Sequence, residues 1–153
     1  MKKLSLLFIL GLAVLASCSK DDSGSSSKKD LLCGKYWKIT TLTIDPSFQV
    51  PGGGLTNNLF AVLDPCVQDD VVMYNTNGTS ISDAKVKCEV SDPQTITGTW
   101  SFNSDETIIT ETDIYGSVSY TILELTKTSL KATYKEKIGE VTYTVTLTAV
   151  PAS

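Results

Sequence analysis

The most constraining feature of the sequence is a strict alternation of apolar and polar residues near its end. Threonine occupies every even position from 142 to 148, and the odd positions carry Val141, Tyr143, Val145, Leu147 and Ala149. Successive side chains of a β-strand point to opposite faces, so a period of two predicts a strand with one apolar and one polar face. We expect this segment to cover a core with its apolar side.

The same period recurs through most of the chain and predicts an all-β fold. The expected strands, rich in β-branched and aromatic residues, cover 35–44, 71–74, 84–90, 95–102, 107–112, 118–122, 130–135 and 141–149. Asp45-Pro46 is expected to end the first, and Asn77-Gly78 to form the tip of a type I′ hairpin. About eight consecutive antiparallel strands can close into an up-and-down barrel without exposed edges. An open two-sheet sandwich is the alternative.

One long excursion, residues 45–66, is expected to lie across a barrel mouth. Within it, Leu55–Leu63 carries apolar residues that suit one or two helical turns. The excursion would act as a plug or as a lid, and the plug is the favoured interpretation. Gly52-Gly53-Gly54 lacks the lysine and the hydroxyl residue of a phosphate-binding loop, so it is interpreted as a flexible joint.

Short motifs spread over this region resemble the lipocalin-like domain of small bacterial lipoproteins. They are Gly34-Lys35-Tyr36-Trp37, Cys66 with Asp69-Asp70 behind it, Cys88, and Gly98-Thr99-Trp100-Ser101-Phe102. The resemblance implies a lipocalin-like barrel over residues 31–150 with a small hydrophobic ligand inside. The lipocalin Gly-x-Trp signature is absent as such, because Trp37 lies three residues after Gly34.

The start of the chain resembles the signal peptide of a bacterial lipoprotein. Two lysines precede the apolar run Leu4–Ala16, which is too short to cross about 30 Å of hydrocarbon. The run ends in Leu15-Ala16-Ser17-Cys18, which resembles a lipobox. The resemblance implies that residues 1–17 are removed and that Cys18 carries palmitate and other acyl chains, which anchor the protein in a membrane. A soluble secreted protein is the alternative.

Residues 18–30 are expected to form a flexible tether, because their Ser, Gly and Lys composition cannot build a core. Ser19-Lys20-Asp21-Asp22 resembles the acidic signal that sends some lipoproteins to the outer face of the outer membrane. An ordinary solvated charge run is the alternative. We expect a lipid-anchored outer-membrane protein that faces the cell exterior.

Composition argues against several classes of function. The sequence has no histidine and no arginine, and its net charge is −4. Nucleic acid is a poor partner for such a chain, because cationic contacts to phosphate supply most of that affinity. Without histidine, neither a Ser-His-Asp or Cys-His pair nor a histidine zinc site can form. We expect no catalytic residues, no cofactor, no metal site and no enzymatic activity.

Three cysteines remain if Cys18 is lipidated, and they allow three different single disulfides. We predict Cys66–Cys88, because the segment between them has the pattern of a hairpin that brings its ends together. Closing a loop of that size stabilises the fold by about 3 kcal/mol in the chain-entropy model. Cys33 is expected to be a small buried apolar residue.

Candidate ligand-binding residues are the aromatic residues expected to point into the barrel. They are Trp37, Trp100, Phe102, Tyr120, Tyr134 and Tyr143. An eight-stranded barrel has room for side chains or for one small ligand, so these rings either line a pocket or fill the core. So many bulky rings favour a largely filled interior with a shallow pocket at one end. Asp64, Asp69 and Asp70 do not match an EF-hand loop and are expected to cap turns or face water.

Two functions remain. In the first, the barrel binds a small, partly apolar ligand at the cell surface. In the second, the barrel is filled, and the domain is a non-catalytic interaction module that contacts an envelope protein or a glycan. The lipocalin-like resemblance and the long mouth excursion favour ligand binding.

Overall fold

The computed structural model describes residues 26–152. The predictions for the signal peptide, for Cys18 and for the acidic segment after it lie outside these residues. Within the described part of the chain, no helix has the length and apolar character needed to cross a membrane.

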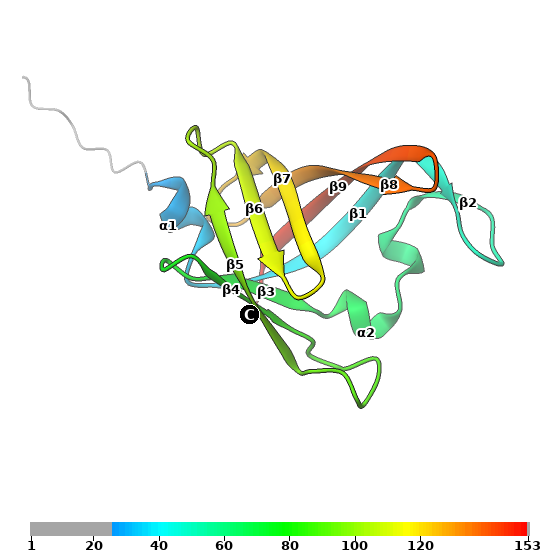
Figure 1. Ribbon diagram of the computed structural model, residues 1–153, viewed down its shortest axis with the longest axis horizontal. Helices are drawn as coiled ribbons and strands as arrows, with labels where there is room; N and C mark the ends of the chain where they lie inside the picture. The colour runs from blue at the N-terminus through cyan, green and yellow to red at the C-terminus, as the bar shows by residue number, and fades with distance from the viewer. Residues whose placement is uncertain (1–25, 153) are drawn as a thin grey trace, which may run out of the picture.

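The described residues form nine strands and three short helices (Figure 1). The strands are β1 (Tyr36–Gln49), β2 (Leu55–Asn58), β3 (Val71–Tyr74), β4 (Thr79–Asp83), β5 (Thr95–Phe102), β6 (Ile108–Asp113), β7 (Gly116–Leu125), β8 (Leu130–Ile138) and β9 (Val141–Pro151). The helices are α1 (Lys28–Leu32), the 3-10 turn η1 (Phe60–Val62) and α2 (Pro65–Gln68).

Eight of these strands close into an antiparallel barrel. The sheet order is β2-β1-β3-β4-β5-β6-β7-β8-β9, and β9 pairs back onto β1. This closure confirms the predicted all-β up-and-down barrel and excludes the two-sheet sandwich, which would leave both edge strands open. β2 lies outside the ring, where it extends the far end of β1 (Figure 1).

The closing strand β1 is longer than expected, because Asp45-Pro46 does not end it. β1 pairs with β3 near its start, with β9 from Trp37 to Asp45 and with β2 from Thr43 to Gln49. Pro46 falls between Thr43 and Phe48, where the register with β2 shifts. A proline, which has no N–H to donate, is tolerated at such an irregularity.

The hairpin after β3 forms as predicted, but its turn is of another type. Gly78 has φ of 85° and its N–H donates to the carbonyl of Asn75. Glu106 is the sole described non-glycine residue with positive φ, so Asn77 is not left-handed and the turn is not type I′. The pattern is that of a type I turn followed by a left-handed glycine bulge.

Two segments differ from the predicted secondary structure. The return strand expected at 84–90 is instead β4, which begins directly after the turn at Thr79 and pairs fully with both β3 and β5. Residues 84–94 are therefore left as the β4–β5 connection. Of the one or two helical turns expected over Leu55–Leu63, η1 forms, whereas Leu55–Asn58 is the strand β2, because the backbone at Leu55 and Thr56 pairs with β1.

Helix α1 closes one end of the barrel, and it begins inside the segment predicted as tether. Ser27 caps it, since its hydroxyl accepts from the N–H of Asp30 while the Asp30 carboxylate accepts from the N–H of Ser27. This reciprocal cap makes helix formation favourable at residues 28–30. Leu32 is fully buried, and the indole N–H of Trp37 donates to its carbonyl at 2.8 Å.

The barrel turns alternate between two ends. The hairpin turns β3–β4, β5–β6 and β7–β8 lie at the α1 end, where α1 and the residues after it contact them. Gly34 N–H donates to the carbonyl of Tyr74, Lys28 Nζ to that of Glu106 and Lys35 Nζ to that of Lys127. The β6–β7 turn and the β4–β5 connection lie at the opposite end.

Inward residues follow the predicted alternation. On β9, Val145, Leu147 and Ala149 are buried, and on β5 Gly98 and Trp100 are buried while Thr97 and Thr99 are exposed. Large rings gather behind α1. Tyr74 meets Trp100 edge-on at 5.6 Å between ring centroids, and Trp100 meets Phe102 at 5.2 Å. Bulky side chains therefore fill the end of the barrel that α1 covers.

Candidate functional site

The barrel interior contains a cavity of about 390 Å³. This volume lies within the range of small-molecule binding sites, about 300 to 1,000 Å³. Every barrel strand except β5 contributes to its wall. The expectation of a largely filled interior is therefore wrong.

Small residues on two adjacent strands leave this space. Leu130 of β8 faces Ala149 of β9, and Ala132 faces Leu147, so each cross-strand pair on this wall contains one alanine. All four side chains are buried and line the cavity. An eight-stranded barrel is just wide enough for its interior side chains to meet. The two alanines, which are diagonal neighbours on β8 and β9, leave the room that larger residues would occupy.

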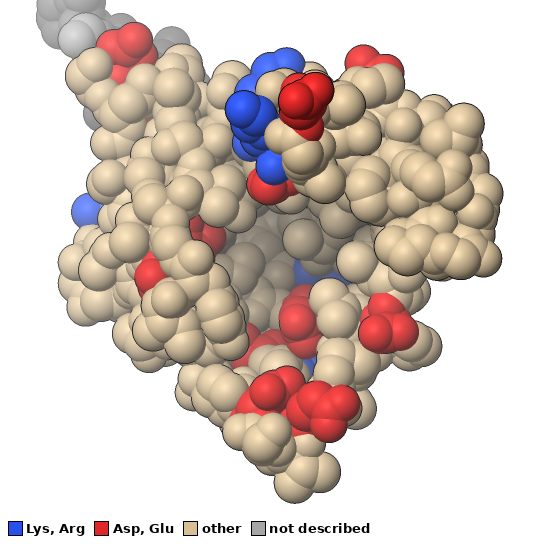
Figure 2. Space-filling model, turned by 45° about the vertical axis from the view of Figure 1, so that its right-hand side comes forward, with Lys and Arg blue, Asp and Glu red and all other residues tan. Residues whose placement is uncertain are grey.

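The cavity opens at the end of the barrel away from α1. Asp70, Ser82 and the β6–β7 turn at Asp113–Ser117 form this rim. Figure 2 shows a hollow on this side of the molecule, with acidic side chains along much of its edge and lysine side chains at its upper edge. The excursion at 45–66 contributes no residue to the cavity wall, so it is not the predicted plug.

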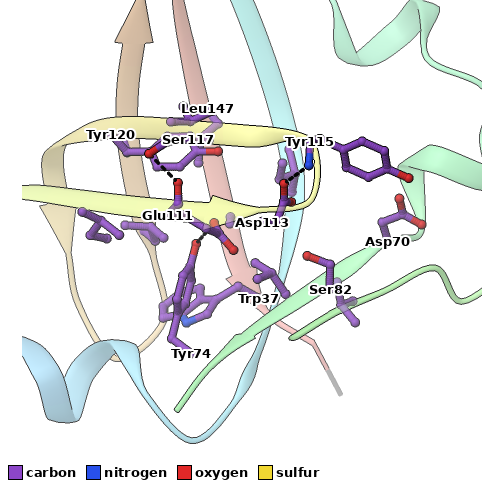
Figure 3. A pocket seen from close by; sticks show the side chains of 18 of the residues that line it. Trp37, Asp70, Tyr74, Ser82, Glu111, Asp113, Tyr115, Ser117, Tyr120 and Leu147 are labelled. Atoms are coloured by element: carbon purple, nitrogen blue, oxygen red, sulfur yellow. Dashed lines mark hydrogen bonds between the residues drawn. The ribbon is translucent and has the colours of Figure 1, made fainter. Parts of the chain in front are cut away.

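Glu111 is the polar group in the depth of the cavity. It lies on β6 between Ile109 and Asp113, which share its face of the strand, and all three line the cavity. The phenol of Tyr74 donates to its Oε2 at 3.1 Å (Figure 3). Burial raises the pKa of Glu111, and so does Asp113, while hydrogen bonds from Ser80 and Tyr74 act in the opposite direction.

Tyr74 and Tyr120 remain neutral phenols beside this carboxylate. Burial and the neighbouring charge of Glu111 raise the pKa of both hydroxyls far above the physiological range. Tyr74 is 4% exposed, so its hydroxyl is a buried donor held on Glu111. The pair can therefore accept a hydrogen bond or a positive charge from a molecule in the cavity, with the carboxylate as the acceptor.

The rim carries two further carboxylates. Asp113 accepts from the backbone N–H of Tyr115 at 2.7 Å. Asp70 has one buried carboxylate oxygen, Oδ1, without a hydrogen-bond partner among residues 26–152. Burial, followed by repulsion from Asp69 and Asp83, raises the pKa of Asp70. The ring of Tyr115, which is 76% exposed, points toward Asp70 across the opening (Figure 3).

Two of the six predicted ligand-binding aromatic residues, Trp37 and Tyr120, line the cavity. Trp100 and Phe102 lie on β5, which contributes nothing to the wall, and pack against one another. Tyr134 packs edge-on against Tyr120 at 5.4 Å, and Tyr143 packs against Phe48 at 5.9 Å. The structure thus places four of these six rings outside the cavity wall.

The predicted Cys66–Cys88 disulfide is confirmed, and it ties α2 to the β4–β5 connection. Cys33 is a free, partly buried thiol packed against the core, and burial raises its pKa. Within the described range, no group of three or more acidic or cysteine side chains is placed to hold a metal ion. Of the three aspartates weighed as calcium ligands, Asp70 instead lies on the cavity rim.

Sequence reasoning missed Tyr74, Asp70 and Glu111, the polar groups of the cavity. The signal for Glu111 was present, because Glu111 and Asp113 share the odd positions of β6 with the buried Ile109. A carboxylate at an inward position of a predicted strand is unusual, since a buried charge is costly unless it is paired or functional.

Comparison with known protein families connects this geometry to a family. A family model described as a lipocalin-like domain matches residues 33–149, which run from before β1 to Ala149 of β9. A search of curated proteins finds no match.

Proposed function

The chain belongs to the lipocalin-like domain family, and from that premise we propose that its barrel binds one small, largely apolar molecule. The observation that carries this proposal is the cavity of about 390 Å³, which is open at one end. Ile39, Val72, Ile109 and the leucines of β8 and β9 supply apolar wall. Apolar burial favours binding by about 25 cal/mol per Å² of surface removed from water.

The cavity is suited to binding because its walls already have their shape. Backbone hydrogen bonds of the closed barrel hold the lining strands, and α1 covers the far end. A pocket that needs little ordering on binding loses less of the interaction free energy to conformational entropy. One small molecule with a polar end group near Glu111 fits this arrangement.

We propose further that this module is held on the outer membrane through lipid on Cys18 and faces the cell exterior. The apolar run before Cys18 and the acidic residues after it support this location. The described chain begins next to α1, at the end of the barrel opposite the opening. A tether attached there would leave the opening directed away from the lipid surface.

The domain binds its ligand without converting it, in this proposal. A chain without histidine lacks the usual general base near neutral pH. The polar pair Tyr74–Glu111 can orient a ligand through hydrogen bonding alone.

Native mass spectrometry of the purified full-length protein tests the binding proposal. We expect a small molecule that leaves on denaturation, or binding of added apolar probes detected through the fluorescence of Trp37 in the cavity wall. A protein that is empty and takes no probe would instead favour the interaction module that contacts an envelope protein. Cys18→Ala tests the location, since the variant should carry no lipid, should keep residues 1–17 and should no longer be found in the outer membrane.

A further inference from the structure

None of the ionisable residues that line the cavity carries a positive charge. Asp70, Glu111 and Asp113 are carboxylic acids, the tyrosines are neutral phenols, and no lysine lies in the lining. Figure 2 shows acidic side chains along much of the edge of the hollow, with lysine side chains at its upper edge outside the lining of the cavity. The field inside the cavity is therefore negative, which attracts cations and repels anions.

The Glu111 carboxylate has no positive partner within residues 26–152. The single ion pair of these residues joins Lys85 to Asp83. Lys35 lies over the ring of Trp37, but its ammonium donates to the carbonyl of Lys127. Tyr74 satisfies part of the carboxylate with a neutral hydrogen bond. A buried charge without a counter-charge is costly, and a cationic occupant would remove that cost.

Aromatic rings surround the same space. Trp37, Tyr74, Tyr115 and Tyr120 all line the cavity. The negative face of an aromatic ring attracts a cation by about 0.5 to 2 kcal/mol, more when water is excluded. Aromatic walls beside a carboxylate provide the chemistry that recognises an organic ammonium group.

A metal ion does not fit this site. The carboxylates come from β6 and from the residue before β3, and the described residues bring no three such groups together as metal ligands. A compact ion would also leave most of the apolar wall without contact. The cation must therefore carry an apolar body.

We propose that the occupant of the cavity is an organic ammonium ion with an apolar body, held by the Glu111 carboxylate and drawn in by Asp70 and Asp113 at the rim. This inference rests on the proposed binding function. The ammonium group would donate to the Glu111 carboxylate, while the apolar body lies against Ile109, Leu130 and Leu147.

Three probes with the same body and different end groups test this inference on the purified full-length protein. They are 4-phenylbutylamine, 4-phenylbutanol and 4-phenylbutyrate, which are cationic, neutral and anionic near pH 7. Isothermal titration calorimetry should show that the amine binds about tenfold or more tightly than the alcohol, with the acid weakest. Glu111→Gln should remove the preference for the amine and keep binding of the alcohol. Glu124→Gln, the same change at an exposed position of β7, should keep the preference.

Each other outcome is decisive. Equal binding of the amine and the alcohol, or tighter binding of the acid, would overturn the inference and leave the binding function intact. If none of the three probes binds, both fail. Should Glu111→Gln not fold, the wild-type protein at acidic pH supplies the second measurement. Protonation of Glu111, which is faced by Tyr74, Tyr120, Ser80 and Asp113, must then abolish the preference for the amine.

Discussion

The phenol of Tyr74 on β3 and the carboxylate of Glu111 on β6 form a hydrogen bond of 3.1 Å inside the barrel. Their strands are not neighbours in the sheet, because β4 and β5 lie between them. The bond therefore crosses the interior of the barrel. It holds the carboxylate in the cavity, for which the alanines of β8 and β9 leave space. One pair of residues thereby contributes both to the stability of the barrel and to the chemistry of its cavity.

Replacing Tyr74 by phenylalanine should destabilise the fold by about 1 to 2 kcal/mol, because Glu111 loses a donor in a buried setting. The pKa of Glu111 should also rise further, since the bond from Tyr74 favours the ionised form. Urea unfolding and an NMR titration of the carboxyl carbon measure the two effects. Tyr115→Phe, at a mostly exposed ring, serves as the control and should change neither.

Glu111 should make the stability depend on pH in a defined direction. Its pKa in the folded state is raised above the ordinary value of 4.5, so the folded protein binds this proton more readily than the unfolded chain. Stability from this group is fully present below the unfolded pKa and is lost as pH rises through the folded pKa. We expect the unfolding free energy of Glu111→Gln, relative to that of the wild type, to be higher at about pH 8 than at about pH 4. Asp70 titrates in both proteins, so its contribution cancels in the comparison. If the difference in unfolding free energy between the two proteins were the same at both pH values, the raised pKa of Glu111 would be contradicted.

Enlarging Ala132 should abolish ligand binding without unfolding the barrel. Ala132→Leu places three more carbon atoms in the cavity, which has room for them, so the change in stability should be small. Probe affinity should fall about tenfold or more. Ala61→Leu on η1 makes the same change at an exposed position and should leave affinity unchanged. Retained binding in Ala132→Leu would show that probes bind elsewhere.

Removing the disulfide should lower stability by about 3 kcal/mol, because Cys66 and Cys88 are 22 residues apart and their link restricts the unfolded chain. The double variant Cys66→Ser/Cys88→Ser tests this value by urea unfolding. A reductant should destabilise the wild-type protein to the same extent and should have no effect on the double variant.

Gly98 should not tolerate a side chain. A Cβ at this position would lie 2.7 Å from the carbonyl oxygen of Thr112 and 2.8 Å from Oγ of Ser80. Gly98→Ala should therefore destabilise the protein by about 1 to 3 kcal/mol in thermal unfolding. Gly54→Ala is the matched control, since its Cβ would meet nothing within 4 Å. Equal melting temperatures for the two variants would contradict the close approach of β5 and β6.

The alternation of side chains predicted most strands, because a period of two is a local property of the extended backbone. It failed where pairing outweighed local pattern. Pro46 did not end β1, since that strand has partners on both sides, and residues 84–90 did not form a strand, since β4 had already paired with both neighbours.

The sequence by itself determined that the chain is all-β, which faces its strands bury, and that Cys66 can reach Cys88. Only the tertiary structure decided whether the interior is filled or hollow. That outcome depends on which inward residues become neighbours inside the barrel, where Ala132 and Ala149 leave space and Tyr74 reaches Glu111. Such meetings join residues far apart in the chain, and they follow from strand register and closure, which no local pattern encodes.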